Sequence, residues 1–239
     1  MKCLRVSSTH NSVADLKRVI LEKAMPAESA VVFGDIYKVH GLYAKTCLDL
    51  GCKRVLLIDS LETPEWLKLR LEHAKIDFYK GDFSNPLFMR SVMETFDIGL
   101  AYDVLLHQAP LLSTLHLMLE KVRRRFCIVQ PMLREQRLTN TLIYLPGNTE
   151  ELYPLASQDK EFKMFDRSAV NHSYWIWGMT PSFLSSVLYG EGFDLIHQDE
   201  LAAFEKDNWF YGAYIFERKR ENPLHWANAR IPAGLHTEP

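Results

Sequence analysis

The chain has 239 residues, enough for one sizeable domain or for one domain with a lid. Its formal net charge is -2 and its sequence pI is about 6.5, which excludes a strong overall attraction to nucleic acid or to anionic membranes. No run approaches the roughly 20 apolar residues of a membrane-spanning helix, and the N-terminus lacks the apolar core of a signal peptide. The four cysteines show no CxxC spacing. We interpret them as reduced thiols, and we expect a cytoplasmic protein without a membrane partner.

Helical and strand patterns alternate along the first 133 residues. A helix is expected at 12–25, where Val13, Leu16 and Ile20 share one face. Further helices are indicated where a capping side chain precedes a proline, at Thr63 and at Asn85. Buried-type strands are expected at 29–35, 53–60, 75–83, 96–103 and 124–133, with helices at 40–51, 63–73 and 110–122 and another that starts at 84–86. This alternation predicts an α/β fold with a doubly wound, mostly parallel sheet and helices on both faces.

The pattern changes after Leu133. Residues 134–179 are polar and turn-rich, and we interpret them as an insertion or lid over the carboxyl ends of the strands, with a surface loop as the alternative. Regular signals return with a helix that Thr180 caps and with two strands, up to residue 219. The predicted organisation is an N-terminal helical segment (1–28), a first half of the domain (29–133), the insertion (134–179), a helix and strand pair of the same domain (180–219) and a tail (220–239).

The stretch from Ala30 to Ser60, AVVFGDIYKVHGLYAKTCLDLGCKRVLLIDS, reads as a strand, a loop, a helix and a second strand. Nucleotide-binding half-sheets begin in this way, and an acid such as Asp59 at the tip of the second strand can accept hydrogen bonds from both hydroxyls of a ribose. A pyrophosphate requires a glycine-rich loop that lets the backbone approach closely. The loop from Asp35 has Gly41 as its only glycine, which argues against NAD or FAD.

Three acids at successive strand ends carry a family resemblance. With Asp35 before Gly41, Asp59 in LLIDS and Asp82 in YKGDF, residues 30–219 resemble the class I S-adenosylmethionine-dependent methyltransferases. The family's first loop has the pattern D/E-x-G-x-G-x-G, and here Tyr37 and Val39 stand at its first two glycines. The resemblance implies a sheet of seven strands, the last of them antiparallel, and S-adenosylmethionine as the cofactor. This cofactor has no phosphate, so the demand for glycine is relaxed.

The resemblance also implies roles for individual residues. Asp59 would hold the ribose, Asp82 the adenine amino group, and Phe83 would cover the adenine ring. Asp35 would favour the positively charged methionine end. Tyr37, Gly41 and Asp103 complete the expected cofactor site, with acceptor binding or helix capping as the alternatives for Asp103.

Candidates for the chemistry lie near the fourth strand and before the late helix. His107 and His172 could act as bases or hydrogen-bond donors, and a loop histidine bonded to nearby backbone is the alternative for His107. Tyr174, Trp175 and Trp177 could line the acceptor pocket, or they could pack the insertion against the sheet. The scattered histidines form no HxH or HxxxH pair, so no metal site is expected.

The leading hypothesis is a methyltransferase that acts on a small-molecule acceptor by in-line displacement. An RNA acceptor is a second option. The layout of YLPGN and HSYWIWGMT is similar to that of tRNA wobble-uridine methyltransferases, but many small-molecule methyltransferases share it, so it does not imply a tRNA substrate. The aromatic strand 209–216 could form core or the edge of a homodimer. Tyr37 and Val39 motivate an alternative from another class, an inactive methyltransferase-fold subunit that binds or scaffolds a partner. A nucleotide-dependent oxidoreductase is the third hypothesis.

Overall fold

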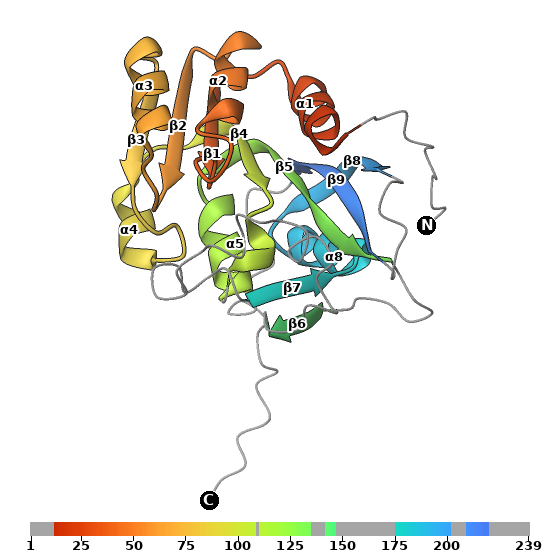
Figure 1. Ribbon diagram of the computed structural model, residues 1–239. Helices are drawn as coiled ribbons and strands as arrows, with labels where there is room; N and C mark the ends of the chain where they lie inside the picture. Colours follow the sequence, from red (N-terminus) through yellow and green to blue (C-terminus); the bar gives the residue numbers. More distant parts are fainter. Residues whose placement is uncertain (1–11, 109, 135–141, 147–174, 202–208, 220–239) are drawn as a thin grey trace, which may run out of the picture.

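A computed structural model describes residues 12–108, 110–134, 142–146, 175–201 and 209–219. Its main feature is a seven-stranded sheet with the strand order β3-β2-β1-β4-β5-β9-β8 (Figure 1). The strands are β1 (Ser29–Phe33), β2 (Arg54–Asp59), β3 (Ile76–Lys80), β4 (Phe96–Tyr102), β5 (Val122–Leu133), β8 (Phe193–Leu201) and β9 (Trp209–Arg218). The first five run parallel, and β9 is antiparallel to both β5 and β8. The predicted fold class, including the antiparallel last strand, is confirmed.

Helices cover both faces of this sheet. The N-terminal helices α1 (Val13–Ala24), α2 (Leu42–Asp49) and α3 (Pro64–Glu72) contribute to one hydrophobic cluster. The helices α4 (Pro86–Ser91), α5 (Leu111–Leu119) and α8 (Pro181–Gly190) contribute to the other. In β1 the side chains alternate between the two clusters, so the strand is apolar on both faces, as expected of a central parallel strand. Among the described residues, no helix is long and apolar enough to cross a membrane.

The helix starts follow the capping chemistry of the sequence. The Thr63 hydroxyl accepts a hydrogen bond from the Trp66 N–H, and the Thr180 hydroxyl accepts one from the Phe183 N–H. Asn85 caps α4 in the same way. Each cap is followed by a proline at the first turn, where the missing N–H costs nothing. These caps confirm the predicted starts of α3, α4 and α8.

A second, two-stranded ladder lies within the segment predicted as an insertion. It pairs β6 (Leu142–Pro146) with β7 (Trp175–Met179) in antiparallel register. β7 contacts β5 and the short 3-10 helix η1 (Leu105–His107), which follows β4. Part of the insertion therefore packs beside the carboxyl ends of β4 and β5. Residues 135–141, 147–174 and the predicted tail from 220 lie outside the described residues.

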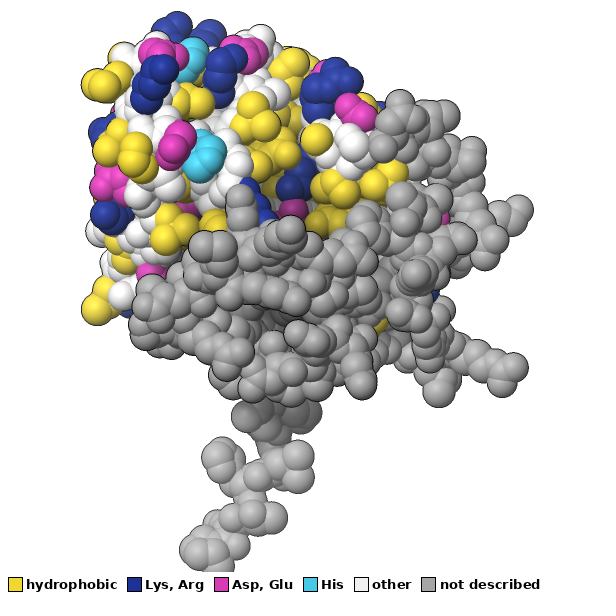
Figure 2. Space-filling model, in the orientation of Figure 1, with side chains coloured by type: hydrophobic (Ala, Val, Ile, Leu, Met, Phe, Trp, Pro, Cys, Tyr) yellow, Lys and Arg dark blue, Asp and Glu magenta, His cyan; other side chains and the backbone are white. Residues whose placement is uncertain are grey.

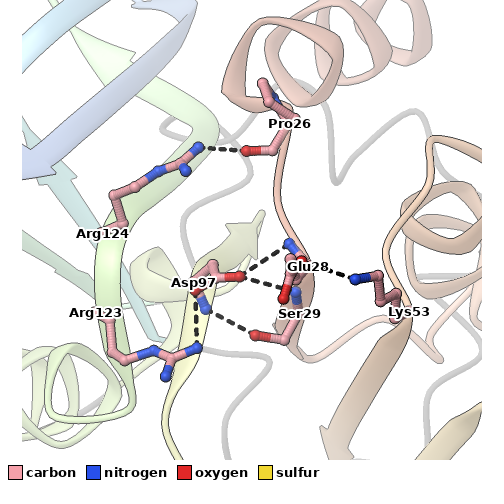
Figure 3. A network of polar contacts seen from close by, with 7 residues as sticks. All are labelled: Pro26, Glu28, Ser29, Lys53, Asp97, Arg123 and Arg124. Carbon is pink, nitrogen blue, oxygen red and sulfur yellow. Dashed lines mark hydrogen bonds and ion pairs between the residues drawn. The ribbon is translucent and has the colours of Figure 1, made fainter.

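Polar contacts fasten the opposite, amino-terminal ends of the strands (Figure 3). Asp97 Oδ2 accepts hydrogen bonds from the main-chain N–H groups of Glu28 at 2.9 Å and Ser29 at 3.1 Å. Its Oδ1 binds Arg123 at 2.8 Å, and the Ser29 hydroxyl accepts a hydrogen bond from the Asp97 N–H. The polar groups at this edge thus bind one another, whereas ligands of open α/β sheets bind at the carboxyl edge.

Candidate functional site

Three acids lie at the carboxyl ends of neighbouring strands. Asp35 follows β1 by two residues, Asp59 ends β2 and Asp103 follows β4 directly. Because the order β2-β1-β4 places these strands side by side, the three carboxyl groups gather at one edge of the sheet. Carboxyl ends of this kind form the ligand crevice of open α/β folds. The sequence analysis grouped Asp35 and Asp59 with Asp82 and named Asp103 as a further candidate, and it is Asp103 that follows the strand next to β1.

Asp35 is buried and only partly bonded. Its side chain is 2% exposed, and its Oδ2 accepts a hydrogen bond from the Ala44 N–H at 2.8 Å. Its Oδ1 has no hydrogen-bond partner among the described residues. Desolvation raises the pKa of this carboxyl to about 8, although the N–H groups of Ala44 and Tyr43 and the charge of Lys17 act in the opposite direction. A buried oxygen without a donor is costly, and it is the strongest indication of a ligand in this crevice.

Asp59 holds the first loop to the sheet. Its Oδ2 accepts from the Ile36 N–H at 2.9 Å, and its Oδ1 accepts from the Leu61 N–H at 2.9 Å. Burial raises the pKa of this carboxyl, and these main-chain bonds oppose the rise. Each carboxylate oxygen keeps a second lone pair, so Asp59 can still accept from a ribose. The sequence did not reveal that this acid already has a structural task.

The loop between β1 and α2 carries side chains at two positions where the resembling family has glycine. Val39 packs against the cluster beneath α1, α2 and α3, so its bulk is accommodated within the protein's own packing. Tyr37 is 37% exposed, and the ammonium of Lys38 lies 5.4 Å from its ring centroid. Gly41 has φ 85°, and a Cβ there would lie 2.5 Å from Cε3 of the buried Trp66. The retained glycine thus serves helix packing.

A partly buried ion pair joins α1 to the end of β4. Lys17 Nζ lies 2.5 Å from Asp103 Oδ2, and the same ammonium lies over the rings of Tyr43 and Tyr102. Burial acts to lower the pKa of Lys17, but attraction to Asp103, Tyr43 and Asp35 outweighs it and the pKa is raised. Figure 2 shows acidic and basic side chains together in a recess bordered by hydrophobic side chains.

Lys17 is the functional candidate that the sequence interpretation missed. A signal was available, because the residue stands three and four positions before Ile20 and Leu21 on the buried stripe of α1. A lysine on such a stripe requires a partner.

The backbone of Asp103 is unusual as well, because its φ is 56°. Its N–H donates to the Val129 carbonyl at 2.8 Å. The backbone here is held by the neighbouring strand.

The residues expected to hold the adenine lie beyond β3. Asp82 is exposed, and its Oδ1 accepts a hydrogen bond from the Ser84 N–H at 2.8 Å, which turns the chain into α4. Phe83 is buried, with its ring 6.0 Å from that of Phe33 in an edge-to-face arrangement. A Cβ on Gly34 would lie 3.8 Å from the Phe83 ring. Their proposed contact with adenine stays a prediction.

On the acceptor side, the structure brings two predicted segments together. The indole Nε1 of Trp177 in β7 donates to the Gln108 carbonyl at 2.6 Å, directly after His107 in η1. His172 and Tyr174 lie outside the described residues, as does the side chain of Trp175. His107 and Trp177 are therefore the acceptor-side candidates that the structure places near each other. Among the described residues, no cluster of three metal-binding side chains occurs.

Comparison with known proteins identifies the fold. No family model matches the chain, and no curated protein matches its sequence. Solved structures do match, among them the Burkholderia thailandensis 1,6-didemethyltoxoflavin-N1-methyltransferase with bound S-adenosylhomocysteine. The alignment has 18% identity and a TM-score of 0.59, and it covers 89% of this chain and 80% of that chain. The N-methyltransferase NodS from Bradyrhizobium japonicum WM9 matches at 11% identity and a TM-score of 0.53, over 89% of this chain and 100% of that chain.

A third match separates fold from chemistry. The [4+2]-cyclase SpnF aligns at 10% identity with a TM-score of 0.59, over 86% of this chain and 81% of that chain. The chain thus has the fold of the S-adenosylmethionine-dependent methyltransferases. One fold hosts several reactions, so the activity has to be argued from the site.

Proposed function

We propose that the protein is an S-adenosylmethionine-dependent methyltransferase that transfers a methyl group to a small-molecule acceptor by in-line displacement. The observation that carries this proposal is the buried Asp35 Oδ1, which has no partner among the described residues and lies at the carboxyl end of β1. The cofactor, when bound, supplies an activated methyl group on a sulfonium. The protein's own task is to hold this group in line with the acceptor and to exclude water.

The charges around this oxygen suit an amino-acid end group. A methionine moiety carries an ammonium and a carboxylate. Asp35 and Asp103 each present an oxygen without a described hydrogen-bond partner, and Lys17 supplies a buried ammonium. The set of two acids and one base therefore complements a zwitterion. Asp59 for the ribose, Asp82 and Phe83 for the adenine, and Tyr37 and Gly41 in the first loop complete the proposed cofactor site.

The acceptor is proposed to lie beside η1 and β7. His107 would take or donate a proton there, with Trp177 beside it, and His172, Tyr174 and Trp175 belong to the same proposal. A small molecule is favoured over RNA because the chain is nearly neutral. The N-methyltransferases with the same fold, one of them crystallised with 1,6-didemethyltoxoflavin, support this preference. The cytoplasmic location and the homodimer stay predictions from the sequence.

Calorimetric titration of the purified protein with S-adenosylhomocysteine tests the proposal. We expect saturable binding with a micromolar dissociation constant and no binding of NAD. The Asp35→Asn variant should bind more weakly, while the matched Asp49→Asn variant at the exposed end of α2 should bind as the native protein does. Absence of binding at millimolar ligand would contradict the proposal and would favour the non-catalytic binding subunit.

A further inference from the structure

The last turn of α2 brings two cysteines together. The helix ends in a Schellman motif, in which the Cys52 N–H donates to the Cys47 carbonyl at 3.0 Å and the Gly51 N–H donates to the Leu48 carbonyl at 2.9 Å. Gly51 supplies the left-handed backbone that this motif requires, with φ 101°. The motif places the side chains of its two outer residues in contact, and these residues are Cys47 and Cys52.

The two thiols also influence each other's ionisation. Both are free thiols. Hydrogen bonding to Cys47 lowers the pKa of the Cys52 thiol, whereas burial raises the pKa of the Cys47 thiol. Cys47 is fully buried, while Cys52 keeps 4% of its surface exposed. Cys52 is therefore the thiol that ionises more readily and that a small oxidant can reach first.

We propose that Cys47 and Cys52 form a reversible redox pair, which a peroxide converts into a disulfide that fastens the end of α2 to the start of β2. A Schellman motif needs only an apolar contact at these two positions, and other small apolar side chains would provide it. The packing alone therefore does not explain why both residues are cysteines. Here the Cys52 N–H bond to the Cys47 carbonyl brings the two side chains together at the end of α2, which is the arrangement that a disulfide between them requires. This inference does not depend on the proposed methyl transfer.

The chemistry balances with hydrogen peroxide as the oxidant. The Cys52 thiolate attacks one peroxide oxygen, the O–O bond breaks, and the hydroxide that leaves takes up a proton to become water. Cys52 is then a sulfenic acid. The Cys47 sulfur attacks the Cys52 sulfur, the S–O bond breaks, and a second water leaves with the proton of Cys47. The two sulfurs together lose two electrons, and the peroxide gains them.

The position of the pair links it to the crevice. α2 also contains Ala44, whose N–H holds Asp35 Oδ2 at 2.8 Å, and the helix begins after Gly41. A disulfide at Cys47 would therefore fix the helix that positions this acid. Cys127 offers a natural control. It is fully buried in β5 and burial raises the pKa of its thiol to about 12, so it should stay reduced.

The test is a peptide map of the full-length protein after brief treatment with hydrogen peroxide. Catalase stops the reaction, N-ethylmaleimide then blocks free thiols in denaturant, and mass spectrometry identifies the peptides. We expect a Cys47–Cys52 disulfide that dithiothreitol reverses, together with a higher melting temperature of the oxidised protein. The Cys127→Ser variant should form the same disulfide.

Two further variants resolve the order of the steps. In Cys47→Ser the sulfenic acid on Cys52 has no resolving thiol, so dimedone should trap it. In Cys52→Ser the Cys47 thiol should stay unmodified. If the native protein keeps both thiols free in excess peroxide, or forms its disulfide through Cys127, the inference is overturned. This outcome needs only the native chain, so it holds even if a variant fails to fold.

Discussion

Lys17 and Asp103, 86 residues apart in the chain, form an ion pair in which Nζ and Oδ2 are 2.5 Å apart. The pair connects the N-terminal helix to the end of β4, beside the carboxyl group of Asp35. The Lys17 side chain is 9% exposed and that of Asp103 is 30% exposed, so the lysine depends more strongly on its partner. Removing one member of such a pair leaves the other charge poorly compensated.

The first prediction concerns the stability of this pair. Lys17→Met should lower the free energy of unfolding by about 1 to 3 kcal/mol, because Asp103 loses its counter-charge in a partly buried site. The double variant Lys17→Met/Asp103→Asn should recover part of this loss. Urea unfolding of the native protein, both single variants and the double variant measures the coupling. A coupling energy of zero would show that the contact contributes nothing to stability.

The second prediction compares two glycines with positive φ. Gly51→Ala should lower the free energy of unfolding by about 1 to 2 kcal/mol, the cost of a left-handed backbone with a Cβ. Apart from its two chain neighbours, no described residue has an atom within 4 Å of a Cβ at this position. Gly41→Ala should cost about 1 to 3 kcal/mol more, because its Cβ would also overlap Trp66. Equal losses in denaturant unfolding would mean that Trp66 moves aside without cost.

The third prediction concerns the amino-terminal edge of the sheet. Asp97→Ala should lower the free energy of unfolding by about 1 to 3 kcal/mol, since it leaves the N–H groups of Glu28 and Ser29 without their acceptor. Asp49→Ala is the matched control, because Asp49 forms only an exposed pair with Lys45 on α2. That variant should change stability by less than about 0.5 kcal/mol. Similar losses in both variants would contradict the importance of the main-chain bonds.

The sequence predicted those features that are written in local patterns. Apolar periodicity located the strands, and a capping side chain followed by proline marked the starts of α3, α4 and α8. That acids such as Asp35 and Asp59 share one edge followed from topology, because parallel strands end at one edge. These are short-range signals, or simple consequences of the strand order.

Long-range and main-chain partners were not predictable in this way. Nothing near Asp103 in the sequence points to Lys17, since helix and strand meet only after the sheet is assembled. The N–H groups that donate hydrogen bonds to Asp59 belong to the backbone of Ile36 and Leu61. Every residue except proline has such a group, so the residue types in the sequence do not reveal the bonds. Whether Val39 obstructs the crevice depends on the direction of its side chain. A one-residue change in the loop would turn that side chain from the core toward the crevice.

The fourth prediction concerns the pH dependence of stability. The pKa of Asp35 is raised from 3.8 to about 8, so between these pH values the folded protein holds a proton that the unfolded chain has lost. The contribution of Asp35 to stability is therefore greatest below about pH 4 and falls as the pH rises to about 8. Asp35→Asn cannot ionise. As the pH rises through this window, the free energy of unfolding of the native protein should fall relative to that of Asp35→Asn by up to about 1.4 kcal/mol per pH unit.

Urea unfolding of both proteins at several pH values gives this difference directly. Subtracting the two curves removes the titration of all other groups. A difference that does not change between pH 4 and pH 8 would show that Asp35 is ionised in the folded protein.

The fifth prediction joins this proton to the proposed cofactor site. If the ammonium of S-adenosylhomocysteine pairs with Asp35, binding at pH 7 should displace the proton from this carboxyl, because a nearby cation lowers its pKa. The calorimetric enthalpy should then differ between phosphate and Tris buffers, which take up the released proton with different heats. Affinity should increase with pH and level off above about pH 8, where the free protein has already lost the proton. Asp35→Asn should bind with the same enthalpy in both buffers. Equal enthalpies for the native protein, with binding otherwise intact, would place the ligand's ammonium away from Asp35.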